Sequence, residues 1–213
     1  MTIHVDGLDI DDWFNNLTHD VDVWVTDPPY PFSSQNGTGR YKGMYTRFGW
    51  AKLGQVFEEM YKRTSVGGRA YVFCNRDGLH KTEEALKAAG FTYLNTLIWD
   101  KQHFGGGYHW RNQAEFIIYV SKGKPSIYVK NLSNIFNYKR PCKSDAVPGI
   151  NYDPALTSSK PKEIWRDILV HGASQDEVCA DPFSGSNPMR AAVLTEPALS
   201  SKFREVLTNV FIV

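Results

Sequence analysis

The feature that most constrains the fold is an alternation, along the whole chain, of short apolar runs with longer amphipathic segments. Runs rich in β-branched and aromatic residues predict strands, and apolar side chains at three-and-four spacing predict helices. Strands that alternate with helices pair mainly in parallel, so we expect an α/β fold with a mostly parallel sheet and helices on both faces. Seven strands are predicted, at residues 3–5, 21–26, 69–74, 92–99, 114–120, 177–180 and 209–213.

Two helices are predicted between the early strands. Residues 50–64 carry one apolar face and stop at a pair of glycines. Residues 78–89 predict a second helix, with Asp77 as N-cap and Gly90 just after its end.

Prolines indicate where two later helices begin. Pro161 is expected to open a helix that runs to Val170, and Pro188 stands where a first-turn proline belongs.

The longest stretch without periodicity is 121–158, which predicts an insertion or a binding loop. With 213 residues, the chain is expected to form a single domain over 1–213 with this one small insertion.

The N-terminal residues argue against secretion and membrane insertion. Residues 1–30 hold seven acids and no Lys or Arg, and no apolar run approaches the ~18 residues that span a bilayer. The three cysteines are widely spaced and form no CxxC pair, so we expect reduced thiols and no metal site. These features together predict a cytoplasmic protein.

Positive charge is concentrated in one segment. Residues 121–144 contain six Lys or Arg and no acid, with Tyr128, Phe136 and Tyr138 between them. Such a composition fits a solvated loop, and it also fits a surface for a polyanion with exposed bases.

A rigid acidic turn follows the strand predicted at 21–26. It consists of Asp27, Pro28, Pro29 and Tyr30. The prolines fix φ and give the Pro28 carbonyl a set direction, so this carbonyl and the Asp27 carboxylate form a pair of acceptors beside an aromatic face. Such a pair suits an amino group on a planar ring, because it holds the amine hydrogens and draws the nitrogen toward a pyramidal, nucleophilic geometry. The alternative is a plain turn with Asp27 as a cap.

A second candidate site is the turn after the strand predicted at 177–180. It reads DPFSGSNP from Asp181 to Pro188. Gly185 permits close backbone approach to a ligand, and the following helix N-terminus presents unpaired N–H groups. One glycine does not make a dinucleotide fingerprint, so by itself this turn fits a ligand loop and a plain strand–helix turn equally well.

Together these motifs resemble those of the S-adenosylmethionine-dependent amino-methyltransferases of DNA. The resemblance covers nearly the whole chain and rests on TDPPY at 26–30, WDKQHFGGGYHWRNQAEFIIYVSKGK at 99–124, SKP at 159–161 and DPFSGS at 181–186. The order of the motifs is that of the circularly permuted β group, with the catalytic motif first. The resemblance implies a seven-stranded Rossmann-like sheet with one antiparallel strand.

The resemblance also implies roles for named residues. Asp27 and the Pro28 carbonyl would hold the target amine, and Tyr30 would stack on a flipped-out base. A general base is not required, because the sulfonium is a good leaving group and positioning by the acceptors suffices. The residues implied to bind S-adenosylmethionine are Asp6, Asp27, Ser159, Lys160, Asp181, Phe183, Ser184, Gly185, Ser186 and Asn187.

DNA contacts are expected from two segments. His109, Trp110 and Arg111 follow three glycines and suit base flipping, phosphate contact or plain loop packing. Lys139, Arg140 and Lys143 belong to the basic segment and suit phosphate contact.

The sequence departs from the family's pattern at three points. Leu156 and Thr157 replace the usual His-Pro before SKP, and Asn187 replaces a usual glycine, although Asn tolerates a positive φ. The family also implies a ribose-binding acid at the tip of the strand after the cofactor loop. The strand predicted at 209–213 lacks this acid, and Glu196 would follow an unusually short helix.

The sequence therefore predicts an enzyme that methylates the N6 amine of adenine in double-stranded DNA, since the family more often pairs Asp at the first motif position with adenine and Ser with cytosine. Cytosine-N4 is the alternative substrate, and a weakly active or inactive nucleic-acid-binding relative is the alternative class. A bacterial or phage-infected bacterial cytoplasm, a homodimer and a cognate restriction endonuclease are the further expectations that the family suggests.

Overall fold

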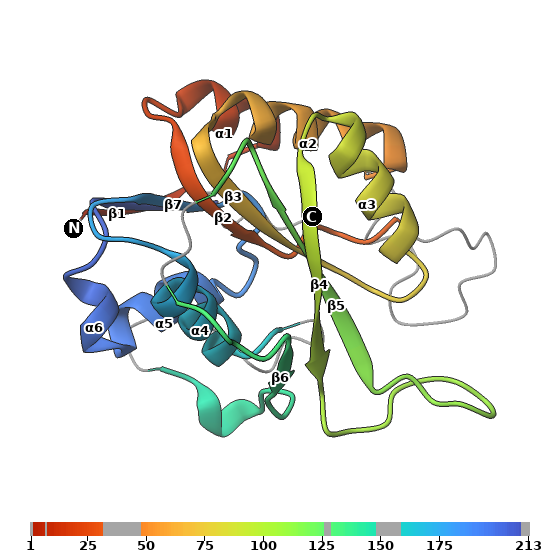
Figure 1. Ribbon diagram of the computed structural model, residues 1–213. Helices are drawn as coiled ribbons and strands as arrows, with labels where there is room; N and C mark the ends of the chain where they lie inside the picture. Colours follow the sequence, from red (N-terminus) through yellow and green to blue (C-terminus); the bar gives the residue numbers. More distant parts are fainter. Residues whose placement is uncertain (1, 7, 32–47, 126–128, 148–158, 210–213) are drawn as a thin grey trace.

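The computed structural model describes residues 2–6, 8–31, 48–125, 129–147 and 159–209. These residues form one eight-stranded sheet in the order β1-β8-β7-β2-β3-β5-β4-β6 (Figure 1). β5 alone runs antiparallel to its neighbours, which confirms a mostly parallel sheet with one reversed strand. The strands are β1 Thr2–Asp6, β2 Val21–Thr26, β3 Thr64–Cys74, β4 Thr92–Asp100, β5 Ala114–Ser121, β6 Ile135–Asn137, β7 Val178–Asp181 and β8 Glu205–Asn209.

Two strands differ from the prediction. The first is an eighth strand, β6, which lies inside segment 121–158. The sequence missed it because three residues are too few to show a period. β6 is defined by its pairing with β4, next to which the Ile98 N–H donates to the Asn134 carbonyl at 2.7 Å. The second is β8, Glu205–Asn209, which the sequence did not predict. The strand predicted at 209–213 shares only Asn209 with β8, and its remaining residues lie outside the described residues.

In the described residues, six helices cover the sheet in two layers. On one face lie α1 Ile10–Asn16, α2 Trp50–Lys62 and α3 Leu79–Ala88, and on the other lie α4 Lys162–Gly172, α5 Pro188–Thr195 and α6 Pro197–Ser200 (Figure 1). The helices predicted at 50–64, at 78–89, from Pro161 and from Pro188 are confirmed. A 3₁₀ turn, η1 Lys143–Asp145, follows β6. None of the described helices is both long and apolar enough to span a membrane.

The sequence missed α1 and α6 and misplaced one cap. The Asp9 side chain caps α1 by accepting from the Asp11 N–H at 3.1 Å, and α1 buries Trp13 and Phe14. Asp77 was wrong as the N-cap of α3, because Gly78 holds that position. The Gly78 N–H donates to Asn75 Oδ1 at 2.7 Å instead.

The topology gathers polar side chains at one edge of the sheet. Parallel strands end at the same edge, so Asp6, Asp100 and Asp181, the last residues of β1, β4 and β7, all lie there. β5 runs the other way and therefore begins at this edge, with Glu115 paired to Trp99 of β4. Residues from the N-terminal and C-terminal parts of the chain, such as Asp6 and Asp181, thus lie along the same edge of the sheet.

Candidate active site

The two predicted motifs lie on neighbouring strands. β2 pairs in parallel with β7, with Trp24 opposite Ala180. At the end of these strands the Thr26 hydroxyl donates to Asp181 Oδ1 at 2.7 Å, and both side chains are fully buried. The residue just before the acidic turn is therefore hydrogen-bonded to the first residue of the glycine turn, 155 positions further along the chain.

Both carboxylate oxygens of Asp27 carry hydrogen bonds. The Tyr30 hydroxyl donates to Oδ1 at 2.7 Å, and the Lys160 ammonium donates to Oδ2 at 2.8 Å. Lys160 comes from the segment just before α4, and its Nζ lies 5.3 Å from the centre of the Tyr30 ring. The structure thus brings together Asp27, Tyr30 and Lys160, three of the predicted site residues.

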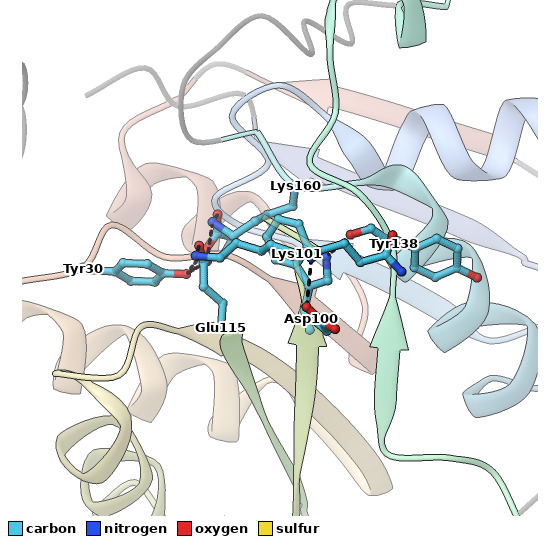
Figure 2. Close-up of polar contacts among 9 residues, drawn as sticks. Tyr30, Asp100, Lys101, Glu115, Tyr138 and Lys160 are labelled. Atoms are coloured by element: carbon cyan, nitrogen blue, oxygen red, sulfur yellow. Dashed lines mark hydrogen bonds and ion pairs between the residues drawn. The ribbon is translucent and has the colours of Figure 1, made fainter. Parts of the chain in front are cut away.

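Sequence reasoning missed two charged residues of this cluster, Glu115 and Lys101. Glu115 Oε2 lies 3.2 Å from Lys160 Nζ and 3.4 Å from the Tyr30 hydroxyl, and Glu115 Oε1 lies 3.4 Å from Lys101 Nζ. Figure 2 shows these side chains converging from separate segments of the chain. The only signal in the sequence is one acid within the apolar run AEFIIYV. We call Asp27, Tyr30, Lys101, Glu115 and Lys160 the edge cluster.

Burial and pairing oppose each other in the edge cluster. Burial raises the pKa of Asp27, and Lys160 offsets this only in part. Burial by itself would also raise the pKa of Glu115, but Lys160 and Lys101 together hold that pKa below its ordinary value. Burial disfavours the charged form of Lys160, yet Asp27 and Glu115 raise its pKa above the ordinary value. The cluster thus balances two ammonium groups against two carboxylates.

Two residues of the glycine turn have a left-handed backbone conformation. Gly185 has φ +43° and Asn187 has φ 58°, so the Asn that replaces the usual glycine does adopt a left-handed conformation. Asn187 also begins α5, with its side-chain oxygen accepting from the Arg190 N–H at 3.4 Å. Phe183 is buried with its ring edge-on to Phe48, the centroids 5.4 Å apart.

Two buried polar atoms in this turn are free to form hydrogen bonds with a ligand. Asp181 Oδ1 accepts from Thr26 and from the Phe183 N–H at 3.1 Å, whereas Asp181 Oδ2 and Ser184 Oγ are buried without a hydrogen-bond partner in the described part of the chain. Buried acceptors and hydroxyls are normally satisfied. A polar small molecule at this edge would satisfy them, so the turn fits a cofactor such as S-adenosylmethionine.

The other predicted cofactor residues are distributed along the same edge. Ser159 and Ser186 are buried, the first beside Lys160 and the second within the turn. Asp6 ends β1 and pairs with Asn209, so β8 separates it from the Asp181 strand. Glu196 is wrong as the acid at a strand tip, because it follows the far end of α5, and the next strand, β8, starts only at Glu205.

The first group of predicted DNA-binding residues lies on the connection between β4 and β5, residues 101–113, which projects from the sheet (Figure 1). We call this connection the arm. Arg111 stabilises it by donating to the carbonyls of Gly105 at 3.0 Å and Phe104 at 3.2 Å. His109 and Trp110 are exposed, Trp110 to 85%. The arm therefore presents an aromatic side chain to solvent on an internally hydrogen-bonded support.

The second group, Lys139, Arg140 and Lys143, is exposed between β6 and α4. Tyr138 anchors this stretch, since its carbonyl accepts from Trp99 Nε1 at 2.7 Å and its hydroxyl accepts from Arg166 at 2.9 Å. The Tyr138 hydroxyl also donates to Asp167 of α4. The cations thus follow a residue that is fixed to both the sheet and a helix.

Comparison with known proteins assigns the family. The DNA methylase family, whose members modify adenine N6 or cytosine N4, matches residues 21–196, most of the chain. This chain belongs to that family. The matched region contains all the residues of the edge cluster and the whole glycine turn. The methylase is also 23% identical over 174 residues to YubD of Escherichia coli (strain K12), a protein named as a methylase. The aligned region covers 82% of this chain and 71% of YubD.

Solved structures share the fold of this methylase. The complex of M1.HpyAVI with S-adenosylmethionine superposes with a TM-score of 0.67 at 16% identity and covers 98% of this chain and 93% of the other. The cytosine-N4-specific PvuII DNA methyltransferase superposes with a TM-score of 0.70 at 11% identity, covering 98% and 82%. At these identities the likeness establishes the fold alone.

The buried carboxyl of Asp181 should make stability depend on pH. Burial raises the pKa of Asp181 to about 7, above the ordinary value of 3.8. The stability due to the neutral carboxyl is therefore complete below about pH 4 and is lost as the pH rises through about 7. Because asparagine carries no charge to bury, the gain in melting temperature of Asp181→Asn over the wild type should be larger at about pH 8 than at about pH 5. Thermal unfolding followed by circular dichroism measures this gain, with exposed Asp20→Asn as control. A gain that is equal at both pH values contradicts the raised pKa.

Proposed function

We propose that this methylase transfers the methyl group of S-adenosylmethionine to the exocyclic N6 amine of a flipped-out adenine in double-stranded DNA. The observation that carries the proposal is the hydrogen-bonded junction of β2 and β7 at one edge of the sheet, where Thr26, the residue just before Asp27, donates to Asp181, the first residue of the glycine turn. This junction places an amine acceptor beside a loop with unsatisfied buried polar atoms.

The acidic turn supplies what an aromatic amine needs to become a nucleophile. The Asp27 carboxylate and the Pro28 carbonyl accept the two amine hydrogens, while the rigid Pro28-Pro29 backbone fixes the direction of the second acceptor. Tyr30 offers a face on which the extruded base stacks. Asp27, at the first position of the motif, favours adenine over cytosine within the family resemblance.

Residues on both sides of Asp27 would hold the cofactor. The loop would consist of Asp181, Phe183, Ser184, Gly185, Ser186 and Asn187. Ser159 and Lys160, from the segment just before α4, and Asp6, at the end of β1, would complete the site. S-adenosylmethionine supplies a methyl group bound to a sulfonium sulfur. The amine nitrogen bonds to the methyl carbon as the carbon–sulfur bond breaks and its electron pair stays on sulfur, and the nitrogen then releases one proton.

Two surfaces support binding of DNA. The arm has no acid between residues 101 and 113 and exposes His109 and Trp110, and Arg111 donates to a carbonyl within the arm. Lys139, Arg140 and Lys143 form the second surface and suit a phosphate backbone. The segment 121–158 therefore remains our candidate for DNA recognition, with β6 joining it to the sheet.

The proposal is tested by incubating the purified protein with methyl-labelled S-adenosylmethionine and unmethylated, enzymatically amplified genomic DNA. Hydrolysis of the DNA and separation of the nucleosides should show the label in N6-methyladenine. Label in N4-methylcytosine retains the family and corrects the substrate. DNA binding without transfer favours a binding protein and overturns the proposal.

Replacing Asp27 should abolish methyl transfer and leave the protein folded. Asp27→Ala removes the acceptor for the amine, whereas Lys160 keeps Glu115 at 3.2 Å as a counter-charge. We expect a fall in rate of at least about a hundredfold, with an unchanged circular dichroism spectrum. Asp20→Asn is the control, since Asp20 is exposed before β2. Activity of Asp27→Ala within a few-fold of wild type would exclude the catalytic role.

Tyr30 should act through its ring rather than its hydroxyl. Tyr30→Ala is expected to cost about 1 to 3 kcal/mol of base stacking, while Tyr30→Phe keeps the ring and most of the activity. The affinity of each variant for DNA containing an unpaired target base, measured by fluorescence anisotropy, separates the two. Equal losses in Phe and Ala would assign the role to the hydroxyl.

The salt dependence of DNA binding should identify the phosphate contacts. Each contact contributes a log–log slope of about −0.9 on duplex DNA, so replacing Lys139, Arg140 and Lys143 together by Ala should flatten the slope by up to about 3 units and weaken all sequences alike. The matched control removes three exposed lysines from helices α2 and α3: Lys62, Lys81 and Lys87. An unchanged slope means a solvated loop. If the triple variant loses its preference for particular DNA sequences but keeps the slope of the wild type, this segment reads bases instead of contacting phosphates.

A further inference from the structure

The acceptor that the proposed reaction needs is already hydrogen-bonded within the protein. Asp27 Oδ1 accepts from Tyr30 at 2.7 Å, and Asp27 Oδ2 accepts from Lys160 at 2.8 Å. A carboxylate binds an amine hydrogen well only when the donor approaches one of its lone pairs. A target amine must therefore share Asp27 with these donors or displace one of them.

Both donors also face a second carboxylate. Glu115 Oε2 lies 3.2 Å from Lys160 Nζ and 3.4 Å from the Tyr30 hydroxyl. Each donor is nearer to Asp27, so each can change acceptor by moving less than about 1 Å within hydrogen-bonding range. Figure 2 shows the Tyr30 hydroxyl and the Lys160 ammonium close to the side chain of Glu115.

Glu115 is suited to remain an ionised acceptor. Its other oxygen pairs with Lys101 at 3.4 Å, and β5 fixes its backbone at the edge of the sheet through pairing with β4. A buried ammonium that leaves one carboxylate loses much of its stabilisation unless a second anion is in place. Lys160 is only 6% exposed, and Glu115 supplies that anion.

We propose that Glu115 is a positioning residue for methyl transfer: it takes over the Lys160 ammonium and the Tyr30 hydroxyl when the target amine engages Asp27. The inference rests on the proposed function. In the free protein the two donors keep the partly buried Asp27 carboxylate satisfied. When the base enters, Glu115 receives them, Asp27 becomes available, and the total charge of the edge cluster does not change. Glu115 thus acts on the reaction through Lys160 and Tyr30.

The first test compares Glu115→Gln with the wild type and with Glu58→Gln, an exposed position on α2. A neutral amide holds the ammonium less well, so Lys160 stays on Asp27. We expect the single-turnover rate of methyl transfer to fall at least about tenfold, while the Kd for S-adenosylmethionine, measured by calorimetry, changes less than about threefold. A purely structural role would lower the thermal stability and both parameters together, and a wild-type rate in Glu115→Gln overturns the inference.

A second comparison asks whether Glu115 acts through the two donors. In the background Lys160→Met with Tyr30→Phe, neither donor is present, so adding Glu115→Gln should change the remaining rate less than about twofold. The same tenfold loss in both backgrounds would mean direct contact of Glu115 with the substrate and would overturn the positioning role.

A third measurement follows Lys160 without turnover. NMR couplings across the hydrogen bond, between Lys160 15Nζ and carboxyl 13C, should connect Lys160 to Asp27 in the free protein. In the complex with DNA and S-adenosylhomocysteine they should connect Lys160 to Glu115. A coupling that stays on Asp27 in the complex overturns the inference even if the variants lose activity. Absence of any methyl transfer by the wild type would instead overturn the proposed function, and this inference with it.

Discussion

The candidate site depends on the balance of charge in the edge cluster. Two carboxylates and two ammonium groups lie close together where water is largely excluded, and the removal of charges from water is costly unless each has a partner. Lys160 lies between Asp27 and Glu115, and Lys101 neutralises the outer oxygen of Glu115. This balance offsets part of the cost of ionising the partly buried Asp27, and an ionised Asp27 is what the reaction that we propose requires.

The balance in turn depends on the direction of one strand. β5 is antiparallel, so its first residues lie at the edge where every parallel strand ends. A parallel β5 would place Glu115 at the opposite edge and leave the two lysines to a single carboxylate. The reversed strand also fixes where the arm lies, because the connection between β4 and β5 is made at this same edge. One topological feature therefore supplies both a charge of the cluster and the projecting surface that suits DNA.

A second link joins the cluster to the glycine turn. The bond from Thr26 to Asp181 connects the last residues of two adjacent strands, so the positions of the acidic turn and the glycine turn are not independent. Asp181 itself is fully buried, and Trp165 of α4 presents a buried indole N–H without a partner in the described residues. The polar groups left unsatisfied in this region lie in or next to the turn that we assign to the cofactor.

The sequence by itself determined the local features of this protein. Alternating apolar runs predicted the sheet and most helices, because burial on a strand or helix leaves its period in the chain. TDPPY and DPFSGS predicted the two turns, since proline and glycine restrict or permit backbone angles wherever they stand. Only the tertiary structure decided that Glu115 and Lys101 join Asp27 and that Ile135–Asn137 forms a strand. Their neighbours come from distant parts of the chain, and contacts between distant residues follow from strand order and direction, which no local pattern records.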